Sequence, residues 1–186
     1  MVSRKFLPCI KCLAVASAIA VATGVAFIYS GLYPMGADDR HTALTYWALE
    51  TLRERSISRA SAGIDVPADL DTPERLLAGG ADYNDMCVGC HLKPGKTESD
   101  FTLGLYPAPP HLARQTQGEG DAESRVRRRF WTIKHGIKAS GMPAWGPGHN
   151  DERIWNMVAF LRRLPDLSPE QYQILTARGS TDSDHH

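Results

Sequence analysis

The sequence has no excess of charge of either sign. It contains 21 lysine and arginine residues against 21 aspartate and glutamate residues, so its formal net charge is zero. Domains that bind nucleic acid usually carry a basic patch or a strongly basic composition. We therefore expect no nucleic-acid partner.

Charge is absent altogether from one long stretch near the N-terminus. No charged residue occurs from Cys12 to Ala37, and the segment from Leu13 to Tyr33 is predominantly apolar. A membrane-spanning helix needs about 20 such residues. We therefore predict a cytoplasmic N-terminus over residues 1–11 and a transmembrane anchor over residues 12–35.

The few charges that flank this stretch predict its orientation. Arg4, Lys5 and Lys11 precede it, whereas Asp38 and Asp39 follow it. Because basic flanks stay in the cytoplasm, we expect a single-pass protein of the inner (cytoplasmic) membrane whose main domain lies on the periplasmic side. The alternative is a signal peptide cleaved at an Ala-Ser-Ala triplet. That site would leave an apolar region of only a few residues, so an uncleaved anchor is favoured.

Cysteine is scarce, and its four copies occur in two pairs. Cys87 and Cys90 belong to a Cys-x-x-Cys-His segment that ends at His91, whereas leucine replaces the histidine after Cys9 and Cys12. The complete segment is the attachment signature of a c-type haem, in which both thiols bond to the haem and the imidazole binds the iron. We therefore predict one haem c, with Cys9 and Cys12 as reduced thiols.

Two other kinds of site share the Cys-x-x-Cys spacing. A zinc site would need a second pair of ligands at a suitable spacing, and the remaining cysteines lie at the far N-terminus. A thioredoxin-like redox motif would belong to a βαβ unit, and no alternating apolar strand precedes Cys87. The residues around the motif support neither alternative.

The segment between the anchor and the motif, residues 36–71, combines an amphipathic helix with a linker. Apolar residues recur there at helical spacing: Leu44, Trp47, Ala48 and Leu52. Charged residues fill the other face: Glu50, Arg53, Glu54 and Arg55. The pattern predicts a surface helix over about residues 41–60. Its apolar stripe could contact the main domain, the bilayer surface or a partner subunit.

Local signals predict the remaining helices. Thr72, Pro73 and Glu74 supply an N-cap, a first-turn proline and a first-turn acid, so a helix should run from there to the haem cysteines. A second helix is expected over residues 121–135. A short terminal helix should begin after Ser168.

One of these helices carries a glycine that predicts a helix crossing. Gly79, Tyr83 and Cys87 share one face, so the glycine and the aromatic ring can meet another helix while the cysteine meets the haem. The partner helix should begin at the N-cap Asn150 and stop before Pro165.

With these features the chain resembles the class I cytochrome c family, whose N-terminal and C-terminal helices cross at a glycine and an aromatic residue. The resemblance covers residues 72–165, which we expect to form the cytochrome c domain. It implies an all-α fold with helices packed around one covalently attached haem, in addition to the transmembrane helix. Residues 166–186 are expected to form a short helix and a disordered tail.

Two further matches come with this resemblance. The segment Pro110-His111-Leu112 is similar to the family's Pro-x-Leu segment, which implies that the Pro110 carbonyl accepts a hydrogen bond from the axial histidine. The segment Gly141-Met142-Pro143 is similar to the family's ligand loop, which implies that Met142 is the second axial ligand. Other candidates for that position remain: His111, His135 and His149.

The resemblance implies an electron carrier, not an enzyme, because histidine and methionine ligands leave no open position on the iron. We expect single-electron transfer between respiratory-chain components. The redox partners would be a dehydrogenase or quinol-oxidising donor and a terminal oxidase or other acceptor. The alternative is a permanently bound haem c subunit of a dehydrogenase or terminal oxidase complex. A haem enzyme or gas sensor is less well supported by a single motif with a methionine ligand.

Overall fold

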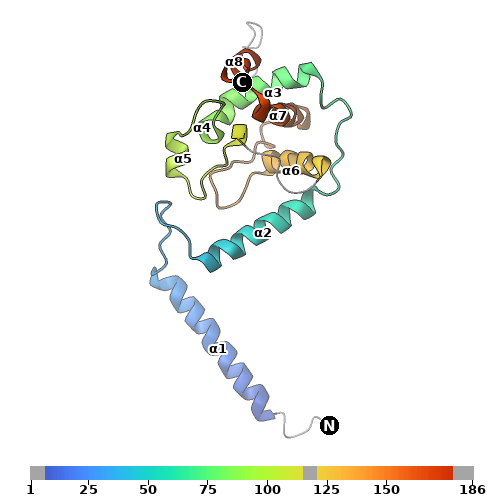
Figure 1. Cartoon of the computed structure of the whole chain (residues 1–186). Helices are drawn as coiled ribbons and strands as arrows, with labels where there is room; N and C mark the ends of the chain where they lie inside the picture. The colour runs from blue at the N-terminus through green and yellow to red at the C-terminus, as the bar shows by residue number, and fades with distance from the viewer. Residues whose placement is uncertain (1–6, 115–120, 178–186) are drawn as a thin grey trace. The chain divides into compact units, whose positions relative to one another are not determined.

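The computed structural model describes residues 7–114 and 121–177, which form helices joined by turns and loops, with no strand in these ranges. The chain divides into two compact units, Met1–Asp39 and Arg40–His186 (Figure 1). The flanking charges Arg4 and Lys5 and the tail predicted over residues 179–186 lie outside the described residues.

The first unit consists of one apolar helix, α1 (Leu7–Ser30). Its segment Ile10–Ser30 is 21 residues long, has a mean hydropathy of 2.1 and is exposed. The helix stops where Gly31 adopts a positive φ of 65°, a conformation that often ends helices. Length and composition therefore allow α1 to cross a bilayer.

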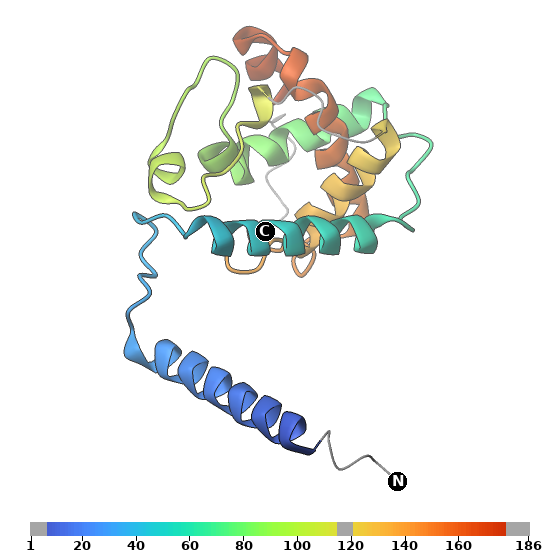
Figure 2. The same ribbon diagram turned by 60° about the horizontal axis from the view of Figure 1, so that its bottom comes forward.

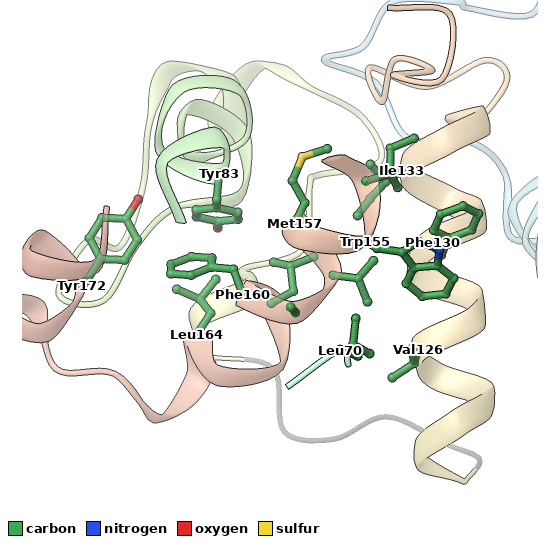
Figure 3. Close-up of a cluster of buried hydrophobic side chains, with 14 residues drawn as sticks. Leu70, Tyr83, Val126, Phe130, Ile133, Trp155, Met157, Phe160, Leu164 and Tyr172 are labelled. Atoms are coloured by element: carbon green, nitrogen blue, oxygen red, sulfur yellow. The ribbon is translucent and has the colours of Figure 1, made fainter. Parts of the chain in front are cut away.

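The second unit is built on the crossing of α3 (Pro73–Met86) and α7 (Asp151–Arg163). Gly79 lies at this crossing, where α3 contacts the α7 backbone. Tyr83 is fully buried there, and its ring centre lies 5.4 Å from that of Phe160 (Figure 3). The predicted crossing at a glycine and an aromatic residue is confirmed.

Capping hydrogen bonds form at three of the predicted helix starts, Asp121, Asn150 and Ser168, whereas the side chain of the predicted N-cap Thr72 forms none. The Asn150 side chain accepts a bond from the Arg153 N–H at 2.9 Å, and α7 begins at the next residue. Asp121 accepts a bond from the Ser124 N–H at 2.8 Å and caps α6 (Ala122–His135). These ends form where predicted because caps are local interactions.

Helix α6 packs on α7 through its apolar side. Phe130 stacks on Trp155 of α7, with ring centres 4.1 Å apart (Figure 3). Val126 and Ile133, one turn before and one turn after Phe130, are also buried. Leu70 joins the same core and is only 2% exposed, although the sequence places it in a linker. The packed unit therefore begins before the predicted domain boundary at residue 72.

The amphipathic helix predicted over residues 41–60 forms as α2 (Ala43–Ser61) and lies along α6 (Figure 2). It contacts the rest of the unit through its mainly polar side. Glu54 pairs with Arg128 of α6, and Ile57 and Ser61 are buried. The predicted apolar stripe points outward instead. Arg55, predicted on the charged face, is exposed and follows Leu52 on the outward side.

Short elements complete the unit: α4 (Val88–His91), α5 (Asp100–Gly104), η1 (Leu112–Arg114), η2 (Leu164–Asp166) and α8 (Pro169–Leu175). Helix α8 covers α3 through Tyr172, whose hydroxyl donates to Oδ1 of Asn84 at 3.1 Å. The turns η1 and η2 contact each other. Of these elements, α4 and α8 contact α3, and α5 contacts α4, which carries part of the cysteine motif.

Candidate haem site

The two cysteines and the histidine of the motif lie on one helical turn. The Cys87 N–H donates to the Tyr83 carbonyl at 2.9 Å and ends α3, while the Cys87 carbonyl accepts the Cys90 N–H at 3.1 Å and the His91 N–H at 2.8 Å. Both cysteines are half-buried free thiols. The local backbone therefore presents two thiols and an imidazole from adjacent positions.

The environment of Cys87 does not favour thiolate chemistry. Burial raises the pKa of its thiol to about 12, and the charges of Asp82 and Cys90 act in the same direction. A redox-active cysteine of the thioredoxin kind has a lowered pKa, so that it is a thiolate near neutral pH. Before any haem is attached, burial therefore favours the protonated thiol of Cys87 over the thiolate.

The imidazole of His91 is held by a backbone carbonyl. Its Nδ1 donates to the Pro110 oxygen at 2.9 Å, as the Pro-x-Leu segment predicts. This bond leaves Nε2 as the nitrogen available to a metal. Burial lowers the pKa of His91, against the opposing effect of the Pro110 bond. The neutral imidazole, which is the form that binds metals, is therefore favoured.

Met142 lies in the loop between α6 and α7, and this loop folds back on the end of α6. Gly136 ends α6 with a φ of 63°, and a Cβ there would lie 2.8 Å from the Met142 oxygen. The Met142 N–H donates to the Ser140 hydroxyl at 3.1 Å, and its carbonyl accepts the Ile137 N–H at 3.1 Å. The half-buried Met142 side chain packs against the core.

The rival histidines already have contacts of their own. Nε2 of His111 donates to the Lys96 carbonyl at 2.8 Å, and its Nδ1 is buried without a hydrogen-bond partner in the described chain. Nδ1 of His149 donates to the Trp145 carbonyl at 3.1 Å. The ring of His135 lies 4.9 Å from that of Trp131. The His111 bond joins two loops, whereas the His149 and His135 contacts are with residues one helical turn earlier in the chain.

One contact beside the motif was missed by sequence reasoning. The Tyr83 hydroxyl donates to the Leu92 carbonyl at 2.6 Å. Leu92 follows His91 directly and has a φ of 64°, which is unfavourable for a residue with a side chain. Burial raises the pKa of Tyr83 and keeps its hydroxyl a donor. Tyr83 thus fixes the chain where it leaves the motif, a role that its position in the helix pattern did not indicate.

A separate cavity of about 850 Å³ lies where the N-terminal ends of α3 and α6 meet the C-terminal end of α7. Five arginines line it: Arg114, Arg125, Arg129, Arg162 and Arg163. Burial lowers the pKa of Arg129, and the charges of Arg125 and Arg162 add to this. None of Cys87, Cys90, His91, Pro110 and Met142 lines the cavity, so it is distinct from the candidate haem site.

The residues at the motif match what a covalently attached haem requires. Haem c needs two thiols at this spacing and a neutral imidazole with one free nitrogen, which Cys87, Cys90 and His91 provide. A zinc site would instead need several ligands close together. In residues 7–114 and 121–177, no three His, Cys, Asp or Glu side chains group in that way.

Comparison with protein families gives a match over the cytochrome-like part of the chain. Residues 74–161 match the model of the family described as cytochrome c oxidase, cbb3-type, subunit III. The matched segment begins in α3 and ends in α7, and it includes the motif, Pro110 and Met142. A comparison with curated proteins and a comparison with solved structures each found no match.

Proposed function

We propose that this chain carries single electrons between respiratory-chain components at a membrane surface. The match of residues 74–161 to a family of cytochrome c oxidase subunits supports a domain that transfers electrons through one covalently bound haem. The observation that carries the proposal is the helical turn with two thiols and a carbonyl-held imidazole inside the matched segment. The chain's contribution is to hold the cofactor, choose its ligands and limit its contact with water.

We assign the cofactor contacts residue by residue. Cys87 and Cys90 would hold the haem covalently, and His91 and Met142 would bind its iron. The carbonyl of Pro110 accepts a hydrogen bond from Nδ1 of His91, and this leaves Nε2 as the nitrogen that would bind the iron. When bound, the haem supplies a one-electron couple between ferric and ferrous iron, and a thioether ligand favours the ferrous form. With two ligands from the protein, the haem iron would have no coordination position left for a substrate.

The position of the domain at a membrane is also part of the proposal. It is supported by the length and apolar character of α1 and by the basic residues that precede the apolar segment. With this topology the domain would lie on the periplasmic side of the membrane. The donor would be a dehydrogenase or a quinol-oxidising complex, and the acceptor a terminal oxidase or a similar enzyme.

A second candidate function is that of a permanent subunit, which is favoured by the match to a family of terminal oxidase subunits. In that case the chain would pass electrons inside a terminal oxidase instead of moving between complexes. Solubilisation from membranes in mild detergent, followed by size-exclusion chromatography, separates the two. A subunit elutes with its partners in a fixed ratio, whereas a carrier elutes alone.

Covalent haem tests the function itself. The pyridine haemochrome spectrum of the purified chain should show one haem c per chain, and a redox titration should show one single-electron step. A chain without covalent haem, or with haem that takes up carbon monoxide as readily as an open-site haem protein, would contradict the proposed electron carrier.

A further inference from the structure

Helix α2 exposes an apolar surface that the rest of the described unit does not cover. Leu44 is 74% exposed, Trp47 63% and Leu52 68%, although all three have side chains that usually gain from burial. The helix is held in place by its opposite side, through Glu54 and the buried residues Ile57 and Ser61. The apolar surface is therefore presented by a helix that is itself fixed on the unit.

The charges of α2 are divided between its two sides. Its two acidic residues, Glu50 and Glu54, pair with Arg53 and Arg128 on the side that faces the unit. The outward stripe has no acid and continues into exposed arginines at helical spacing: Leu44, Ala48, Leu52, Arg55 and Arg59. Neither Arg55 nor Arg59 forms an ion pair with a described carboxylate.

The connection to α1 keeps this surface close to a bilayer. Only residues 31–42 separate the end of α1 at Ser30 from the start of α2 at Ala43. A fully extended chain spans at most about 3.6 Å per residue, so the start of α2 stays within roughly 45 Å of the end of α1. If α1 spans a membrane, as the proposed function holds, the bilayer surface is always within reach of α2.

We propose that the outward stripe of α2 lies in the interfacial region of an anionic phospholipid bilayer. Trp47, Leu44 and Leu52 would enter the boundary between headgroups and acyl chains, where leucine and tryptophan of amphipathic helices are favoured. Arg55 and Arg59 would pair with lipid phosphates, because their long side chains can extend from the apolar surface to the headgroups. The cytochrome domain is thereby held on the membrane in one orientation and accepts electrons from partners at that surface.

Depth measurement by electron paramagnetic resonance tests this contact in the full-length, haem-loaded chain. A spin label is attached at Leu52→Cys in a Cys9→Ser/Cys12→Ser background. The reduced protein is placed in phosphatidylcholine vesicles with and without phosphatidylglycerol. A label at Leu103→Cys on α5 is the control, since Leu103 is as exposed as Leu52, at 72%. Accessibility to oxygen and to a water-soluble nickel chelate is measured for each.

In vesicles that contain phosphatidylglycerol, we expect the Leu52 label to be several-fold less accessible to nickel than the Leu103 label and more accessible to oxygen. The double variant Arg55→Glu/Arg59→Glu should lose most of that nickel protection. Equal nickel accessibility at the two positions would overturn the inference. Protection that appears only in native membranes, where other proteins are present, would also overturn it, because the stripe would then bind a protein.

Carbonate extraction of the same vesicles separates the two possible failures. Protein that washes off contradicts the membrane anchor of the proposed function and, with it, this inference. Protein that remains in the vesicles while the Leu52 label stays in water contradicts this inference alone.

Discussion

Gly79 lies so close to Asn156 that a Cβ on residue 79 would be 1.9 Å from the Asn156 carbonyl oxygen. The backbones of α3 and α7 are in direct contact at Gly79, and this contact sets the distance between the two helices. The same crossing brings Tyr83 and Phe160 into contact and places Cys87 at the end of α3. The position of the haem cysteines therefore depends on a residue without a side chain.

Replacement of Gly79 by alanine should destabilise the domain strongly. The new methyl group cannot be accommodated by a side-chain rotation, because the atoms it meets belong to the backbone. Overpacking of this kind costs about 1–3 kcal/mol and occasionally more, and we expect the upper end. Denaturant unfolding of the haem-loaded protein measures the change. Gly104→Ala is the control, since nothing lies within 4 Å of a Cβ there, and equal stability of the two variants would disprove the tight crossing.

Loss of either cysteine of the motif should prevent normal attachment of the haem. We expect Cys87→Ser and Cys90→Ser each to lack one of the two thioether bonds, because serine oxygen does not replace the thiol in this bond. Haem staining after denaturing electrophoresis and the pyridine haemochrome spectrum measure this. Cys12→Ser, a change in α1, should leave both unchanged. Full staining with an unchanged spectrum in both motif variants would refute the assignment.

Met142→Ala should open one axial position. We expect it to remove the iron–sulfur charge-transfer band of the oxidised protein, to lower the reduction potential and to admit cyanide or carbon monoxide. Absorption spectroscopy and a redox titration check this. Met157→Leu is the control, because Met157 is 1% exposed in α7 and leucine conserves its volume. If the band and potential persist in Met142→Ala, another residue is the ligand, with His111, His135 and His149 the next to test.

The attachment of α2 to α6 should weaken in acid. Burial alone would raise the pKa of Glu54, but hydrogen bonds from Arg53 and the charge of Arg128 outweigh it and lower the pKa below its ordinary value of 4.5. A lowered carboxyl pKa means that the stabilisation is complete above 4.5 and disappears as the pH falls through the folded-state value.

We expect this loss to be no more than about 1 kcal/mol, because partly exposed ion pairs contribute little. The measurement is the difference in unfolding free energy between wild type and Glu54→Gln, followed as the pH falls from neutral through that range. The difference should shrink toward zero in acid. Glu98→Gln, which removes an exposed carboxyl, is the control. A Glu54→Gln difference that does not vary with pH would show that the ion pair does not hold α2.

Much of the fold follows from local signals in the sequence. Pro73, Asn150 and Ser168 mark helix starts, because caps and first-turn prolines act within one turn of the chain. The cysteine motif is equally local, since both thiols and the imidazole lie within five residues. These features needed no knowledge of distant contacts.

The side on which α2 packs was decided by tertiary structure alone. The hydrophobic pattern identified a helix with an apolar stripe, but the stripe points to solvent and the charged side faces α6. The reason is that Glu54 forms an ion pair with Arg128, which lies 74 positions away in the sequence. Periodicity shows which residues share a face, but not which partner that face will meet.

The way in which His91 and Met142, the two candidate iron ligands, are held also depends on contacts between distant segments. The sequence placed His91 in the motif and Met142 in a ligand loop. The fold holds the residue after His91 through the Tyr83 hydroxyl, and it seats the Met142 loop against Gly136. Which residues are suited to bind a haem was thus determined by the sequence. How rigidly each is held was decided by packing, because buried hydrogen bonds and close backbone contacts form only when separate elements meet.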